Sequence, residues 1–189
     1  MAYRKLHWKA KAIVDKNFRE IFSAEIISVT GGILAGFLLA VILDKILLIP
    51  GIFIFLPGFL ELRGNISGSL SARLGTALDI GKIKPKYIQR FTIENFAATF
   101  IEVLFVALAL AAIAFLLTYF LFGVAVPSLF LIALIASLVS NLVESSLAIL
   151  TTIWLFKRGH DPNNIMGPYV TTTGDIVGVL SLMLAIWLI

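Results

Sequence analysis

The chain has 189 residues, of which 60% are hydrophobic and only 14% charged, with a formal net charge of +4 and no cysteine. Several apolar runs are longer than the roughly 20 residues that cross a bilayer, which indicates an integral membrane protein. The lack of cysteine excludes disulfides, thiol catalysis and thiolate metal sites. The positive charge is accounted for by membrane topology, so it requires no nucleic-acid partner.

The apolar runs predict five transmembrane helices, so the expected fold class is an all-α integral membrane protein. The expected spans are residues 21–48, 53–80, 93–122, 127–156 and 166–189. Strands of a membrane barrel would be shorter and would alternate between apolar and polar residues. We expect one membrane domain over residues 21–189.

Residues 1–20 precede the first span and are basic. They can form an amphipathic helix on anionic lipid headgroups, and their presence before a full-length span argues against a cleaved signal peptide. Further basic residues lie in the loops after the second and fourth spans, whereas the opposite loops hold little beyond Lys45. The positive-inside rule therefore predicts a cytoplasmic N-terminus and an outside C-terminus. The basic residues are Arg4, Lys5, Lys9, Lys11, Lys16, Arg19, Lys82, Lys84, Lys86, Arg90, Lys157 and Arg158.

The second span is the least lipid-like of the five. Four polar residues recur there at every fourth position, and a pair of glycines with the same spacing lies beside them. This pattern is compatible with tight helix packing or with the lining of an aqueous pathway. Glu61 and Arg73 are about 18 Å apart along a helix and cannot neutralise each other, which favours the pathway. The polar residues are Glu61, Asn65, Ser69 and Arg73, and the glycines are Gly64 and Gly68.

Single acidic residues lie in the first, third and fourth spans, at Glu25, Glu102 and Glu144. For Glu25 and Glu102, a structural role, such as pairing with Arg73, is as compatible with the sequence as a role in transport. Glu144 lies near the middle of its span among polar neighbours and is the better candidate for a functional acid. The excess of intramembrane acids over bases favours cations as the ligand.

The loop before the fifth span contains Asp161, Pro162 and two asparagines, which predicts a helix cap there rather than a metal site at His160 and Asp161. If the helix begins near Pro168, Asp175 lies about 10 Å along it. A carboxylate in an otherwise apolar span costs several kcal/mol unless it is paired or solvated or holds a cation, so Asp175 is expected to be functional. Thr171, Asp175 and Gly178 share one face, and Gly174 with Gly178 forms a second close-packing pair.

The available ligands are carboxylate, amide and hydroxyl oxygens, without cysteine or clustered histidine. Such ligands match hard cations, of which Mg²⁺, Ca²⁺ and Mn²⁺ are candidates, better than they match Zn²⁺ or Cu⁺. Mg²⁺ often keeps its bound waters, so a site with very few carboxylates can serve it. These ligands do not exclude monovalent cations.

Two segments of the sequence resemble the MgtE family of magnesium transporters. Residues 57–83, PGFLELRGNISGSLSARLGTALDIGKI, resemble the family's second helix, and the spacing of Gly64-Asn65 to Arg73-Leu74 is similar to that of its eukaryotic solute-carrier relatives. Residues 161–188, DPNNIMGPYVTTTGDIVGVLSLMLAIWL, resemble the fifth helix, in which a proline precedes a Gly-Asp pair. Both motifs lie in the expected order within a five-span layout.

The resemblance implies a transporter of divalent cations, chiefly Mg²⁺, in the cell membrane. It also implies a homodimer whose pore between subunits is lined by the second and fifth helices, with Asp175 at the position of the family's pore aspartate and Gly64 and Asn65 at its second-helix signature. These 189 residues hold no counterpart of the bacterial cytoplasmic N and CBS domains, so gating is expected from the membrane unit itself or from a separate regulatory protein. The single five-helix unit, where eukaryotic relatives have two, favours pairing of two chains.

The resulting hypothesis is a dimeric Mg²⁺ channel or transporter and not an enzyme. Its expected metal ligands are Asp175, Asn65, Thr171, Glu61 and Glu144, and its expected pore-lining residues are Gly64, Gly68, Ser69, Gly174 and Gly178. Two alternatives are a metal-dependent membrane enzyme acting on lipid-linked substrates and a non-transporting assembly subunit. The enzyme alternative has little support, because the sequence contains no HExxH motif, nucleophile elbow or paired-Asp metal motif of the usual spacing.

Overall fold

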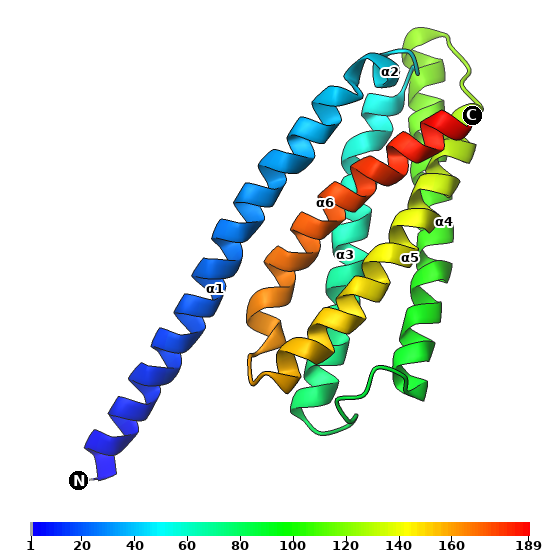
Figure 1. Ribbon diagram of the computed structural model, residues 1–189. Helices are drawn as coiled ribbons and strands as arrows, with labels where there is room; N and C mark the ends of the chain where they lie inside the picture. The colour runs from blue at the N-terminus through cyan, green and yellow to red at the C-terminus, as the bar shows by residue number, and fades with distance from the viewer. Residues whose placement is uncertain (1) are drawn as a thin grey trace.

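The computed structural model describes residues 2–189, with side chains described from Asp15 onward, and the described residues form helices and no strands (Figure 1). Five of the helices are long. The sixth, α2, is a single short turn of helix that follows α1. The bounds are α1 Ala2–Val41, α2 Leu43–Leu47, α3 Ile52–Asp79, α4 Arg90–Phe122, α5 Ser128–Lys157 and α6 Pro162–Leu188. The predicted all-α class is therefore confirmed.

Each long helix overlaps one of the five predicted spans, although α1 ends at Val41 rather than at residue 48, and four of the long helices are long and apolar enough to cross a membrane. These four are Asp15–Val41 of α1, α4, α5 and α6. The exception, α3, has 28 residues, which is ample length for a span, but it carries Glu61, Arg63 and Arg73. Its charges rather than its length separate it from the other four.

The backbone is helical from Ala2, so the predicted basic segment is continuous with the first span; the side chains of residues 1–14, and with them its amphipathic face, lie outside the described residues. One predicted helix start was wrong. The last helix begins at Pro162 instead of near Pro168, which lies inside it. The Asp161 side chain caps this helix by accepting a hydrogen bond of 2.9 Å from the Asn163 backbone N–H, as the sequence predicted.

Helices α3, α5 and α6 pack against one another at the centre of the bundle. Helix α4 packs against α3 and α5, and α1 packs against α6 (Figure 1). The described residues form three apolar clusters in the core, and the two larger ones lie around Phe55 and Phe59 and around Leu70 and Leu74. Arg63 lies between them on α3, so a buried polar layer crosses the middle of the three-helix core.

Large apolar side chains cover the outer faces of α1 and α4. Ile33, Phe105 and Phe120 are among them, and each has more than two thirds of its surface exposed. Such faces are expected where lipid tails replace water as the solvent. The helical fold and these faces together identify a membrane protein.

The basic segments gather at one end of the bundle (Figure 1). The N-terminal end of α1, the α3–α4 loop with its three lysines and the α5–α6 loop lie there, while the C-terminus and the α4–α5 loop lie at the other end. This arrangement is what the positive-inside argument requires of a chain that crosses the membrane repeatedly. The cytoplasmic location of this basic end stays a prediction.

At the basic end, polar contacts join α1 to the loop between α5 and α6. Glu20 accepts hydrogen bonds from Asn164 at 3.1 Å and contacts His160 Nδ1 at 2.9 Å. Lys16 Nζ donates to the Gly159 carbonyl at 2.9 Å. The Glu20 side chain is only 9% exposed, so these contacts are shielded more than those of an ordinary surface ion pair. They hold the long N-terminal helix against the start of α6.

Replacing Glu20 by alanine is expected to loosen this attachment by about 1 kcal/mol, because His160 and Asn164 lose a shared partially buried acceptor. Hydrogen exchange of the α1 amides near residue 20 measures the change, which should appear as faster exchange. Asp15→Ala, at an exposed acid on the same helix, is the control and should leave exchange near the parent value. Equal exchange in the Glu20 variant and the parent chain would contradict this role.

Candidate cation site

Helices α3 and α6 line an open cavity of about 420 Å³. Six predicted site residues line it: two acids, an amide, a hydroxyl and two glycines. These residues are Glu61, Gly64, Asn65, Gly68, Thr171 and Asp175, and the remaining lining residues are Pro57, Leu60, Gly167 and Val170. The two helices that the sequence singled out therefore do share one polar cavity.

The side chains of α3 that reach this cavity are spaced one helical turn apart. Glu61 and Asn65 are exposed in the single chain, and Gly64 and Gly68 leave room beside them. A Cβ atom added at Gly64 would have no neighbour within 4 Å, and one at Gly68 would meet only Val170, at 3.8 Å. The glycines therefore keep the cavity open rather than allowing a close helix contact within one chain.

Asp175 lies further along its helix than the sequence predicted. Because α6 begins at Pro162, this carboxylate is about 20 Å from the start of the helix instead of 10 Å. Its side chain is partly buried, and Thr171 lies one turn before it on the same cavity. The Thr171 hydroxyl donates to the Gly167 carbonyl at 3.1 Å, which leaves its oxygen lone pairs available.

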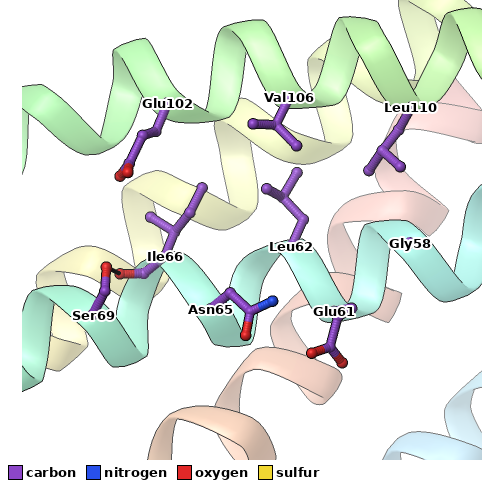
Figure 2. Close-up of a pocket in the computed structure, with 9 residues that line it drawn as sticks. All are labelled: Gly58, Glu61, Leu62, Asn65, Ile66, Ser69, Glu102, Val106 and Leu110. Atoms are coloured by element: carbon purple, nitrogen blue, oxygen red, sulfur yellow. Dashed lines mark hydrogen bonds between the residues drawn. The ribbon is translucent and has the colours of Figure 1, made fainter.

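A second cavity, of about 550 Å³, lies on the other side of α3, against α4. Figure 2 shows Leu62 and Ile66 pointing toward α4, while Glu61 and Asn65 point away from it. Glu102 extends from α4 into this second cavity, where Ser69 also lies. Glu61 and Asn65 line both cavities, so the polar face of α3 runs between them.

Three other predicted site residues lie in the buried polar layer and not on the Asp175 cavity. Glu144 forms an ion pair with Arg63, with 3.0 Å between Oε1 and Nη1, and both side chains are almost fully buried. Arg63 also donates through Nε to the Phe59 carbonyl, donates through Nη1 to the Gly174 carbonyl and stacks over the Phe59 ring. The roles assigned to Glu144, Gly174 and Gly178 stay predictions, but the structure places all three beside Arg63.

The two glycines of α6 provide the space that this ion pair occupies. A Cβ atom at Gly178 would overlap the Arg63 guanidinium, and one at Gly174 would lie 3.3 Å from Glu144 Oε2. The close-packing pair seen in the sequence therefore packs against charged side chains of α3 and α5 rather than against a bare helix. Ser67, one turn after Arg63, donates to Glu144 Oε2 at 3.4 Å.

Arg63 is the residue that sequence reasoning missed, although the sequence held a signal for it. Arg63, Ser67 and Ser71 recur at every fourth position of α3, as regularly as the polar face that was recognised, and all three are buried. The partner proposed for intramembrane acids was Arg73, which instead is exposed and bonds to Ser69 on its own helix. Glu102 and Glu25 are exposed in the single chain.

The cavity offers two carboxylates and neutral oxygen ligands at membrane depth. Within the described side chains, no cluster of three or more His, Cys, Asp or Glu residues lies close enough to hold a metal ion. Carboxylate and amide oxygens that attract a cation through its bound waters do not need such a cluster. The arrangement can therefore attract and orient a hydrated cation.

Comparison with known proteins identifies the family. The family model MgtE, described as divalent cation transporter, matches residues 56–185, which is well over half of the chain and contains most of α3, all of α4 and α5 and nearly all of α6. No solved structure matches the chain. The matched family consists of transporters and not of enzymes, so the alternative of a metal-dependent enzyme is not favoured. The chain belongs to the MgtE family of divalent cation transporters.

Proposed function

We propose that this protein carries Mg²⁺ across the cell membrane as a homodimer, through a pathway lined by α3 and α6 of both chains. The observation that carries the proposal is the exposed polar face of α3, formed by Glu61, Asn65 and Ser69, which borders the cavity containing Asp175. In this arrangement the chain crosses the membrane five times, with its basic end in the cytoplasm.

An exposed polar helix face is costly against lipid tails, because nothing there replaces the hydrogen bonds made by water. A second copy that applies its own α3 to this face would cover both faces at once, as expected for an interface with two-fold symmetry. The same pairing would bring two Asp175 carboxylates and two Glu61 carboxylates to one pathway. The proposed interface therefore resolves the one feature of α3 that does not suit a lipid-facing span.

The ligand set supports Mg²⁺ as the cargo. Asp175 would hold the ion by charge and by hydrogen bonds to its waters, and Asn65 and Thr171 would bind further waters of the same shell. Glu61, on the same cavity, would raise the local concentration of cations. A hydrated ion needs few direct ligands, which suits a cavity with two acids in each chain.

Reconstitution into liposomes tests this function. Vesicles that contain the purified chain and a trapped Mg²⁺-sensitive dye should show Mg²⁺ influx well above that of empty vesicles. Adding Mn²⁺, Co²⁺ or Ca²⁺ outside measures selectivity, and imposing a Na⁺ or H⁺ gradient distinguishes a coupled carrier from a channel. Influx no faster than in empty vesicles would overturn the proposal.

Crosslinking tests the proposed dimer, and the chain suits it because it contains no cysteine. Ser69→Cys, on the exposed polar face of α3, is expected to give a disulfide-linked dimer on mild oxidation in membranes, measured on a non-reducing gel. Phe120→Cys replaces a 76% exposed apolar side chain on α4; it is the control and should stay largely monomeric. Equal crosslinking at both positions would contradict an interface built on α3.

A further inference from the structure

The buried ion pair between Arg63 and Glu144 lies directly behind the proposed cation ligand. Arg63 Nη1 donates to the Gly174 carbonyl, and Gly174 is the residue before Asp175. Glu61 lines the same cavity as Asp175. A fixed positive charge is therefore close to the group that is proposed to attract a cation, which would weaken that attraction unless another acid offsets it.

Glu144 supplies that offsetting charge. It comes from α5, is 2% exposed, contacts Arg63 at 3.0 Å and is not among the residues that line the cavity. The Arg63 guanidinium is also fixed by the Phe59 carbonyl and ring, while its Nη2 atom has no hydrogen-bond partner among the described residues. Arg63 thus retains donors that could turn to a second carboxylate.

We propose that Glu144 is a positioning residue that holds the Arg63 guanidinium on the Gly174 carbonyl and away from the Asp175 carboxylate. With Glu144 in place, Arg63 and Glu144 cancel, and the cavity keeps the negative charge of Asp175 and Glu61. Without the charge of Glu144, the nearest acid that can offset Arg63 is Asp175. The Asp175 carboxylate would then pair with Arg63 and would no longer attract the cation. This inference rests on the proposed role of Asp175 in cation binding.

A pair of substitutions separates this role from ordinary support of the fold. Glu144→Gln keeps the size of the side chain but removes its charge, and should raise the KM for Mg²⁺ influx in proteoliposomes at least about tenfold. The double variant Arg63→Gln, Glu144→Gln removes both charges and should return KM to within about threefold of the parent value. A purely structural role would instead lower the amount of folded protein, and with it the maximal influx rate, while the KM of the folded fraction stayed near the parent value.

Several outcomes would overturn the inference. These are an unchanged KM in Glu144→Gln, or a double variant with a KM as high as that of the single one. If Glu144→Gln fails to fold, the double variant alone decides. A raised KM in a folded double variant contradicts the proposal, and a KM near the parent value supports it. Asp175→Asn, measured alongside, keeps the two claims apart: parent-like influx in that variant refutes the proposed cation site itself.

Discussion

Asp175→Asn is expected to reduce Mg²⁺ influx into proteoliposomes at least tenfold. The amide has nearly the same size and the same depth on α6, so the change removes charge and little else. A hydrated divalent cation depends on that charge, because in a pathway of low dielectric constant each carboxylate contributes far more attraction than it does in water. In the proposed homodimer the substitution removes two carboxylates from one pathway, so the loss of attraction for the cation comes from both chains.

The matched control for this variant is Asp161→Asn, at the other aspartate of the same helix. Asp161 caps the start of α6 outside the cavity, and asparagine is as good a helix cap as aspartate. Influx through the Asp161 variant should therefore stay near that of the parent chain. If Asp175→Asn transported Mg²⁺ as fast as Asp161→Asn, Asp175 would not be the cation ligand.

Both variants also need to be folded for this comparison. Melting of the detergent-solubilised protein should be shifted upward by Mg²⁺ in the parent chain and in Asp161→Asn, since a bound ion stabilises the folded state. The shift should be lost in Asp175→Asn, while its melting without Mg²⁺ stays close to that of the parent or rises, because a charged group at membrane depth has been removed.

Hydrophobic pattern was enough to predict the helices because the physical rule behind it is simple. A helix must be apolar over roughly 20 residues to cross a lipid layer, and residues 93–122 and 127–156 show that pattern almost to the observed ends of α4 and α5. The positions at which helices start were harder to predict from the sequence. The start of α6 was placed too late because Pro168 was taken as a first-turn residue, whereas Asp161 and Pro162 already provide the cap and the first position.

The cavity was predictable from the sequence and the buried ion pair was not, because the cavity residues of α3 lie on one helix face whereas the ion pair joins different helices. Glu61, Asn65 and their glycines follow one face of one helix, so the spacing alone reveals them. The partners of Arg63 lie 81 and 111 residues away, on α5 and α6, and no spacing within α3 indicates which helix faces it. The polar residues on a second face of α3 are visible in the sequence, but only the packing shows which side chains they contact.

Gly178→Ala is expected to destabilise the protein by about 3 kcal/mol. The added Cβ would occupy the place of the Arg63 guanidinium. A flexible arginine could normally move aside, but this one is held by Glu144, by two backbone carbonyls and by the Phe59 ring. Moving it breaks a buried ion pair and leaves Glu144 without its partner, which is the costly way to lose such a contact.

Gly167→Ala, eleven residues earlier on the same helix, supplies the comparison. A Cβ atom there has no neighbour within 4 Å, so the substitution should leave the melting temperature unchanged or raise it slightly, as expected when alanine replaces glycine in a helix. Thermal melting of the detergent-solubilised variants measures the difference. If the two variants melted together, the Arg63 guanidinium would have room to move without loss, and the buried ion pair could not be what fixes α6 against α3 and α5.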